Sequence, residues 1–325
     1  MSDLQFSIAT PTRNALAKLR RCVGSVRGQA GVSLEHLVQD ACSDDGSAAW
    51  LRAQAALDPR LQPVSAADAG MYDAINRAWA RSSGNVLSWL NADEQYLPGT
   101  LQRVQAYLYE HPHVDVLFAD YLVADVAGRA VALRREIPLR RFNVVNSFLN
   151  TQSCTMFFRR ALLDRGALKL DSAYRYAADK ELVLRLLDGG ARFAHLPEVL
   201  AVFGVDGNNL STHARMEQEA EVIRLAYGAF RWRPLRTLAL GARRIERAWR
   251  GGYGRTDFRY QYALDEVPHY ADYQARAVGG RYTLADTEGR AQRLDTPLDT
   301  PLDTGLDTGL DSTPPTAAHK GSHPA

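Results

Sequence analysis

The alternation of strand and helix patterns over the first 125 residues is the feature that most restricts the fold of this chain. Short apolar runs typical of buried strands are separated by segments whose apolar residues recur at helical spacing. This alternation predicts an α/β fold in which helices cover both faces of a mostly parallel central sheet. The predicted strands are 4–10, 33–40, 61–66, 85–90 and 114–125. The predicted helices are 15–28, 47–56, 70–81 and 97–111.

The pattern becomes less regular after residue 125. The sequence predicts a hairpin around Gly128, a strand over 153–160 and a helix over 177–190. Short strands should follow, and a helix over 213–230 should close the globular part. We therefore expect one globular domain over 1–228.

Two segments of unusual composition follow residue 228. Residues 230–255 contain eight arginines and one acid, Glu246, interleaved with large apolar residues. This composition is typical of a helix at a membrane interface, and equally of a helix that packs on the domain with a solvated basic face. Residues 294–315 repeat a four-residue unit rich in Asp, Pro and Gly, which cannot bury a core. We predict a basic amphipathic extension over 229–290 and a disordered low-complexity tail over 291–325.

Overall composition restricts the cellular setting more than the function. The net charge of +2 argues neither for nor against a nucleic-acid partner, and no binding motif accompanies the basic segment, so we expect no nucleic acid. The three cysteines lack metal-type spacing and fit a reducing compartment. The start resembles no secretory signal, and no run approaches the roughly 18 apolar residues of a membrane span. The sequence thus predicts a cytoplasmic protein.

Polar clusters directly follow the first four predicted strands. In a parallel sheet the loops after these strands emerge at one edge and converge. Converging carboxylates repel one another unless a cation or hydrogen-bond donors offset their charge. Oxygen ligands suit Mg²⁺ or Mn²⁺, ions that also bind substrate phosphates, so the residues alone predict a metal-assisted nucleotide or phosphate site. The clusters are 10–14, Asp40 with 43–47, 68–73 and 91–94.

Each cluster also has a simpler explanation. Asp68 taken alone is typical of a helix cap, because a carboxylate at a helix start accepts from free N–H groups. Residues 43–47 alone suit a turn followed by a cap. Asp93 alone fits loop solvation as well as metal binding.

The strings TPTRN, VQDACSDDGS and DAGMYDAINRAWARSSGNVLSWLNADE, in this order, resemble inverting family-two glycosyltransferases of the GT-A fold. The similarity is to the bacterial branch that builds surface polysaccharides. It continues through NTQSCTMFFRRALL and AADKELVLRL and covers roughly residues 4–212. The resemblance implies that 1–228 is a GT-A catalytic domain of the hexosyltransferase type. Such an enzyme moves a sugar from a nucleoside-diphosphate-sugar donor to a glycan or polyprenyl-linked acceptor.

The resemblance also implies roles for residues around the nucleotide. Thr10, Pro11 and Asn14 would line the nucleotide pocket. Asp40 would hydrogen-bond the base, and Asp68 would lie near the nucleotide.

Residues 91–93 take the place of the family's Asp-x-Asp metal motif, with Asp93 as the carboxylate that faces Mn²⁺ or Mg²⁺. Asn91 replaces the more usual first Asp, although this branch often has Asn there. Glu94 stands where a second Asp is common. The longer Glu94 would either shift the coordination or face away.

Asp179 matches the family's catalytic base. Inverting transfer needs one base to deprotonate the acceptor hydroxyl as it attacks the anomeric carbon, while a metal offsets charge on the departing diphosphate. Taken alone, Asp179 would be a helix N-cap, and its neighbours Lys180 and Glu181 are expected to be solvated. Further candidates for the acceptor side are Gln152, His195 and His213, although a lone His between apolar strand residues, as at 195, is more often structural.

Two other functions compete with this interpretation. A sugar nucleotidyltransferase usually has a Gly-rich basic loop after its first strand, which TPTRN lacks. A non-catalytic nucleotide-sugar-binding relative would not need Asp93 and Asp179, which are both present. We expect a cytoplasmic transferase with peripheral contact to the anionic inner face of the cell membrane through 230–255.

Overall fold

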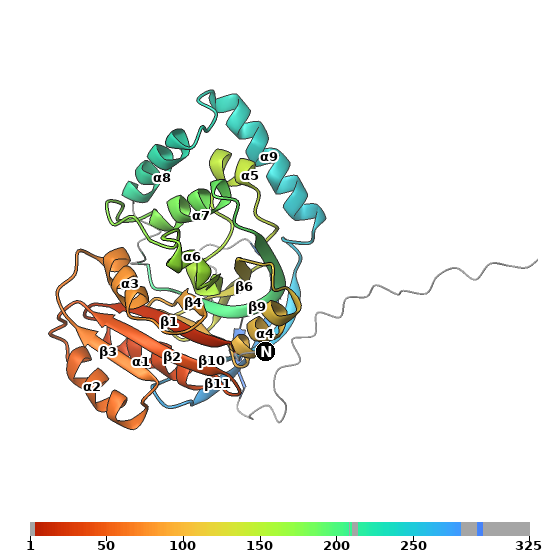
Figure 1. Cartoon of the computed structure of the whole chain (residues 1–325). Coiled ribbons are helices and arrows are strands. Elements are labelled where there is room, and N and C mark those ends of the chain that lie inside the picture. The colour runs from red at the N-terminus through yellow and green to blue at the C-terminus, as the bar shows by residue number, and fades with distance from the viewer. Residues whose placement is uncertain (1–3, 208, 210–213, 281–290, 295–325) are drawn as a thin grey trace, which may run out of the picture.

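The strands predicted in the first 90 residues form one half of a central sheet (Figure 1). The computed structural model describes residues 4–207, 209, 214–280 and 291–294. Within this part the first four strands are all parallel, in the order β3-β2-β1-β4. Their side chains are almost wholly buried in β1, β2 and β4, as expected for strands covered on both faces. The bounds are β1 Gln5–Thr12, β2 Ser33–Asp40, β3 Leu61–Ser65 and β4 Val86–Trp89.

The other half of the sheet is mixed. β8 lies antiparallel between β4 and β6, and β9 runs parallel to β6 over a long register. β7 forms the predicted hairpin with β6, and Gly128 supplies the left-handed turn with φ 83°. The two longest pairings, β1 with β2 and β6 with β9, are parallel, which confirms a mostly parallel α/β sheet. The bounds are β5 Glu94–Tyr96, β6 Val116–Asp125, β7 Ala130–Arg134, β8 Phe157–Arg159 and β9 Phe193–Val205.

Helices cover both faces of this sheet (Figure 1). α1, α2 and α4 pack on one face, and α3, α6 and α7 pack on the other. Trp79 of α3 shows the second packing, since its ring lies 5.4 Å from that of Trp89 in β4. No helix in the described ranges is long and apolar enough to cross a membrane. The bounds are α1 Leu16–Arg27, α2 Ser47–Leu57, α3 Met71–Ala80, α4 Thr100–Glu110, α6 Ala161–Asp164 and α7 Ala178–Asp188.

Three further helices gather beyond α7, at the top of Figure 1. α5 packs against α7, α8 and α9, and a small apolar cluster that includes Val144 and Ile223 joins α5, α7 and α8. A short 3-10 helix, η1, precedes β8. The bounds are α5 Arg141–Asn146, α8 Ala214–Ala226, α9 Arg233–Trp249 and η1 Ser153–Thr155.

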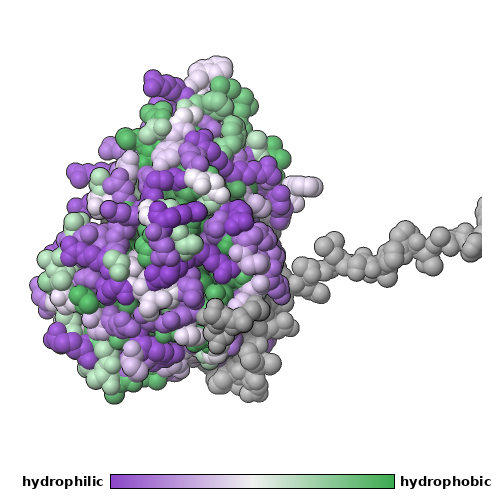
Figure 2. All heavy atoms as spheres, in the orientation of Figure 1, coloured by the Kyte–Doolittle hydropathy of each residue, from purple (hydrophilic) through white to green (hydrophobic). Residues whose placement is uncertain are grey.

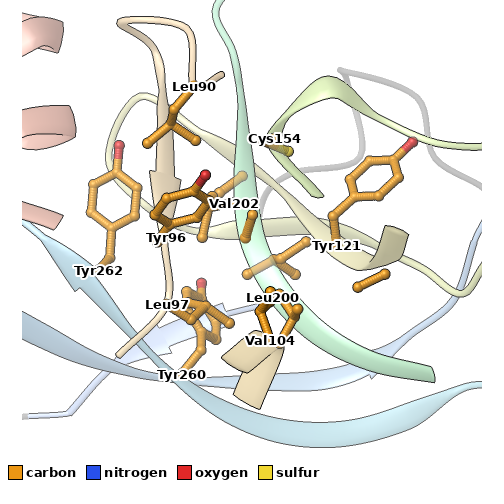
Figure 3. Packing of buried hydrophobic residues seen from close by; sticks show 14 of the residues in the cluster. Leu90, Tyr96, Leu97, Val104, Tyr121, Cys154, Leu200, Val202, Tyr260 and Tyr262 are labelled. Atoms are coloured by element: carbon orange, nitrogen blue, oxygen red, sulfur yellow. The ribbon is translucent and has the colours of Figure 1, made fainter. Parts of the chain in front are cut away.

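A second, antiparallel sheet follows α9 and was not predicted. Its strands are β10 Thr256–Ala263, β11 Tyr270–Val278 and β12 Ala291–Arg293. Tyr260 and Tyr262 belong to the main core cluster, beside Tyr96 and Leu97 (Figure 3). The Tyr260 hydroxyl donates to the Gly128 carbonyl at 2.6 Å. The extension is therefore packed into the domain, and the tail predicted from residue 291 begins with a strand; its residues from 295 onward lie outside the described ones.

Candidate active site

The loops after β1 and β2 are joined by hydrogen bonds. The Asn14 N–H donates to Ser43 Oγ at 2.8 Å, and the Asp44 N–H donates to Asn14 Oδ1 at 3.0 Å. Asn14 has a φ of 50°, a left-handed conformation that Asn tolerates better than most residues. Two of the polar clusters predicted to converge at the sheet edge therefore meet there.

Asp40 joins the loops after β2 and β3. Its side chain is fully buried at the end of β2 and accepts from the N–H and the hydroxyl of Ser43, the former at 3.1 Å. The Ser65 hydroxyl, at the end of β3, donates to Asp40 Oδ2 at 2.5 Å. These donors offset the charge of the carboxylate and hold it in one orientation at the sheet edge.

Thr10 and Pro11 are both buried within β1. The Thr10 hydroxyl lies 2.9 Å from His36 Nε2. Burial lowers the pKa of His36 to about 3, so this imidazole is neutral. Because its side chain is engaged inside the fold, Thr10 would reach a nucleotide only through its backbone.

Asp68 shapes the turn before α3. Its Oδ1 accepts from the Gly70 N–H at 2.9 Å, and the Ala69 N–H donates to Asp73 Oδ2 at 2.9 Å. Gly70 has a φ of 120°, a conformation that side chains of L-residues rarely adopt. The half-buried Asp68 carboxylate is thus held at the start of the helix by local contacts.

Glu94 is turned into the protein. Its Oε2 accepts from the Asn91 N–H at 2.7 Å, and its Oε1 accepts from the Ser153 hydroxyl at 3.0 Å. Burial, together with the nearby charge of Asp93, raises the pKa of Glu94 to about 8. Of the two possibilities in the sequence, the structure therefore has Glu94 facing away from the loop surface.

Asp93 faces α1 and the end of β9. Burial raises the pKa of its carboxyl; the Lys18 ammonium opposes this shift and the Asp206 charge adds to it. Lys18 Nζ lies 2.6 Å from Asp206 Oδ2, and the Asn209 amide donates to Asp93 Oδ2 at 3.3 Å. Asp93 is thus half-buried among groups of both signs.

A small open pocket borders Asp93. Lys18 and Arg21 of α1 line it on one side, and Asp206 on another. Tyr262 of β10 also lines it, so the C-terminal extension contributes directly to the surroundings of Asp93.

Asn91 and Asp93 offer oxygen donors that fit a divalent ion. Within the part of the chain that the structure describes, Asn91 Oδ1 is buried and has no hydrogen-bond partner, and Asp93 supplies a carboxylate. Among the described residues, no group of three or more His, Cys, Asp or Glu side chains could hold a metal. Mg²⁺ and Mn²⁺ commonly take only one or two protein carboxylates and fill the remaining positions with water and substrate phosphates. The two oxygen donors of Asn91 and Asp93 therefore suit an open site whose ion binds together with a diphosphate. They are too few for a closed site made of protein ligands alone.

Asp179 occupies the first turn of α7, beside the start of α3. Its Oδ1 accepts from the Lys180 N–H at 2.8 Å. Burial raises the pKa of Asp179, while the Lys180 N–H and ammonium oppose the shift. Tyr72 of α3 lies close enough that the Asp179 charge, after burial, raises the pKa of the phenol. The structure thus brings the helix that follows Asp68 next to the predicted base.

The neighbours of Asp179 are buried, contrary to the prediction that they are solvated. Lys180 donates to the Ser147 carbonyl at 3.3 Å, and burial lowers its pKa to about 7. Glu181 accepts from Arg185 Nε at 3.0 Å and from the Tyr227 hydroxyl at 2.8 Å. The sequence could not show this, because α5 and α8, which cover this turn, are distant in the chain.

The three acceptor-side candidates have different surroundings. His195 Nε2 lies 2.8 Å from Asp120 Oδ1, and its ring stacks on Phe118 at 5.0 Å, which suits a structural role. Gln152 is half-buried at the start of η1. His213 lies outside the described residues.

Four side chains near the site were not assigned a role from the sequence. Lys18 and Asp206 pair across 188 positions, so no local pattern could connect them. Tyr72 is part of the amphipathic pattern of α3, and Ser153 is part of the string NTQSCT. Both residues therefore lie in segments that the sequence singled out, but the sequence did not show which residues they contact.

Comparisons with known proteins agree with this fold. The sequence profile described as "Glycosyl transferase family 2" matches residues 7–166. A PGL/p-HBAD biosynthesis glycosyltransferase of Mycobacterium tuberculosis is 30% identical over 205 residues, which make up 60% of this chain and 76% of that protein. The succinoglycan biosynthesis protein ExoO of Rhizobium meliloti is 23% identical over 228 residues, covering 66% of this chain and 64% of ExoO. The crystal structure of S. aureus TarS 1-349 in complex with UDP-GlcNAc has a TM-score of 0.56 at 18% identity, over 75% of this chain and 72% of that one.

Proposed function

Because this chain belongs to glycosyltransferase family 2 and has the GT-A fold, we propose that it is an inverting enzyme that uses a nucleoside-diphosphate sugar. The observation that best supports this proposal is the position of Asp179 beside the α3 turn that Asp68 shapes. A carboxylate with a raised pKa next to a donor loop suits a base that acts on an incoming hydroxyl.

The donor would bind along the carboxyl ends of β1 to β4. Pro11, Asn14 and the backbone of Thr10 would line the nucleotide pocket. Asp40 would accept a hydrogen bond from the base, and Asp68 would lie near the nucleotide. The joined loops support this assignment, because their hydrogen bonds pre-organise the polar edge before the donor arrives.

Asn91 Oδ1 and the Asp93 carboxylate would hold Mn²⁺ or Mg²⁺. When bound, such an ion offsets the negative charge that develops on the departing nucleoside diphosphate. Lys18 lies close enough to Asp93 to oppose the rise in its pKa that burial causes, and so favours the carboxylate form that binds a cation.

Asp179 would take the proton of the acceptor hydroxyl as that oxygen attacks the anomeric carbon. The attack comes from the side opposite the diphosphate, so the configuration at that carbon inverts. The Lys180 N–H holds one carboxylate oxygen and so fixes the orientation of the base. Burial raises the pKa of Asp179, and a raised pKa strengthens the affinity of a base for the proton it accepts.

The acceptor would be a glycan or a polyprenyl-linked sugar. The names of two relatives refer to the biosynthesis of PGL/p-HBAD and of succinoglycan, and the second of these supports a glycan acceptor. A lipid-linked acceptor also suits a cytoplasmic enzyme with peripheral contact to the anionic inner face of the cell membrane through 230–255.

A donor panel tests this function. The purified full chain is incubated with individual nucleotide sugars and Mn²⁺ or Mg²⁺, and thermal stabilisation and release of nucleoside diphosphate are measured. We expect one donor both to stabilise the protein and to be slowly hydrolysed. Neither effect with any donor, in protein that unfolds cooperatively, would reject the proposal.

A further inference from the structure

The helix α9 has charged side chains on its inner face and apolar side chains on its outer face. Arg243 and Arg247 are buried against the domain. Leu238, Ile245 and Trp249, which are seven and four residues apart and so lie along one side of the helix, are 68%, 72% and 84% exposed. A helix that merely covers a globular domain has the opposite arrangement.

The buried arginines fix this orientation. Arg243 Nη1 donates to Ser147 Oγ and to the Phe148 carbonyl, and its guanidinium lies 3.9 Å from the centre of the Phe148 ring. Arg247 Nη2 lies 3.3 Å from Glu136 Oε1. Rotation of α9 to bury its apolar side would leave Glu136 buried without this cation, which is unfavourable. The domain therefore holds the apolar side toward solvent.

The exposed apolar surface extends beyond the helix. Trp232, directly before α9, is exposed, and so is Phe142 of α5. The Phe142 ring packs edge-on against that of Phe230 at 5.8 Å, which links α5 to the segment that enters α9. Figure 2 shows apolar residues along the upper part of the molecule, where Figure 1 has α9. We call Leu238, Ile245 and Trp249 the outer α9 face.

Positive charge borders the outer α9 face. Arg231, Arg233 and Arg244 are exposed, and no ion pair involves them within the described part of the chain. Two copies of this face would bring the same arginines together, and this repulsion disfavours a second copy as the partner. Arginines around an apolar stripe that ends in Trp249 instead complement anionic headgroups above an acyl layer.

We propose that the outer α9 face seats the protein on the surface of an anionic lipid bilayer. Leu238, Ile245 and Trp249 enter the boundary between headgroups and acyl chains, and Arg231, Arg233 and Arg244 contact lipid phosphates. This inference deepens the membrane contact in the proposed function and rests on it, but it does not depend on the transfer chemistry. Vesicle binding measured without a donor can therefore fail or succeed independently of catalysis.

The test is co-sedimentation of the full chain with vesicles. Point variants are required, because removal of 229–325 would also remove Tyr260 and Tyr262 from the core. We expect binding to vesicles of phosphatidylcholine with phosphatidylglycerol, and a loss of about tenfold or more in Leu238→Glu/Ile245→Glu. Leu57→Glu is the matched control, since Leu57 is 76% exposed on α2; it should bind like the unchanged protein.

Two further measurements separate lipid contact from its alternatives. Arg231→Gln/Arg244→Gln should weaken binding and make it less sensitive to salt, whereas pure phosphatidylcholine vesicles should bind the unchanged protein poorly. Equal binding by Leu238→Glu/Ile245→Glu and the unchanged protein would overturn the proposal. The proposal would also be overturned if the unchanged protein bound no vesicles and formed a dimer in light scattering, and if Leu238→Glu/Ile245→Glu converted that dimer to a monomer.

Discussion

The buried ion pair between Arg247 and Glu136 should anchor α9 to the catalytic domain. The two side chains are 3% and 1% exposed and lie 3.3 Å apart. Arg247 Nη2 also donates to the Arg135 carbonyl at 2.6 Å. Arg247→Met keeps an apolar stem of similar length and removes the guanidinium, so it tests the charge and hydrogen bonds more than the packing.

The structure sets the expected size of this effect. Removal of one partner from a buried pair typically destabilises a protein by about 3–5 kcal/mol, because the remaining charge stays buried without compensation. Arg134 and Arg243 still act on Glu136 and offset part of its charge. We therefore expect Arg247→Met to lower the free energy of unfolding by about 3 kcal/mol at pH 7.5, the lower end of that range.

The same variant should show a defined pH dependence. Burial raises the pKa of Glu136 above its ordinary value of 4.5, and Arg247 opposes this shift. A raised folded-state pKa means that the folded protein binds the proton more tightly than the unfolded chain. The contribution of Glu136 to the free energy of unfolding is therefore fully present below its pKa in the unfolded chain. It is lost as the pH rises toward the pKa of Glu136 in the folded protein. Without Arg247 the pKa rises further, so the destabilisation should be smaller at pH 5 than at pH 7.5.

Urea unfolding, followed by circular dichroism at pH 5 and at pH 7.5, measures the free energy of unfolding of the unchanged protein and of Arg247→Met. Arg250→Met is the matched control on the same helix, because the Arg250 side chain is 40% exposed and its pair with Glu246 should contribute less than about 0.5 kcal/mol. The reasoning would be refuted if Arg247→Met lost no more stability than Arg250→Met. A larger loss at pH 5 than at pH 7.5 would refute it equally.

Two predictions concern the metal motif. Asp93→Ala should abolish the Mn²⁺- or Mg²⁺-dependent part of nucleoside diphosphate binding in calorimetric titration. If the unchanged protein bound the nucleoside diphosphate equally well with and without the ion, the metal role of Asp93 would be rejected. Glu94→Gln should retain donor hydrolysis within about threefold, because Glu94 is engaged by the Asn91 N–H and the Ser153 hydroxyl. A loss as large as that of Asp93→Ala would instead bring Glu94 into the metal site.

The first half of the fold could be predicted because its signals are local. β2 occupies the predicted 33–40, and α3 differs from the predicted 70–81 by one residue at each end. Each of these segments carries its own periodicity and its own turn residues. β5 and β8 are three residues each, too short for a period to be visible, and β5 was missed.

The C-terminal sheet was missed for a different reason. β10 does alternate over most of its length, with Tyr260 and Tyr262 buried and Arg259 and Gln261 less so, but the arginine-rich segment before it suggested an extension outside the domain. Its attachment depends on contacts such as that of Tyr260 with Gly128, 132 positions away. Such pairings follow from tertiary packing and leave no local pattern.

The candidate site could be predicted as a set of loops but not as a set of orientations. The rule that parallel strands deliver their loops to one edge brought Asp40 and Asn14 to the correct place. The inward turn of Thr10 and of Glu94 depends on His36 and Ser153, partners that only the folded chain supplies.

The base assignment of Asp179 is the central claim, and Asp179→Asn tests it most directly. With the donor found in the panel, nucleoside diphosphate release and acceptor glycosylation are measured beside donor affinity. Loss of one general base predicts a fall in transfer of at least about 100-fold, with donor affinity close to that of the unchanged protein. Near-normal transfer by Asp179→Asn would contradict the account.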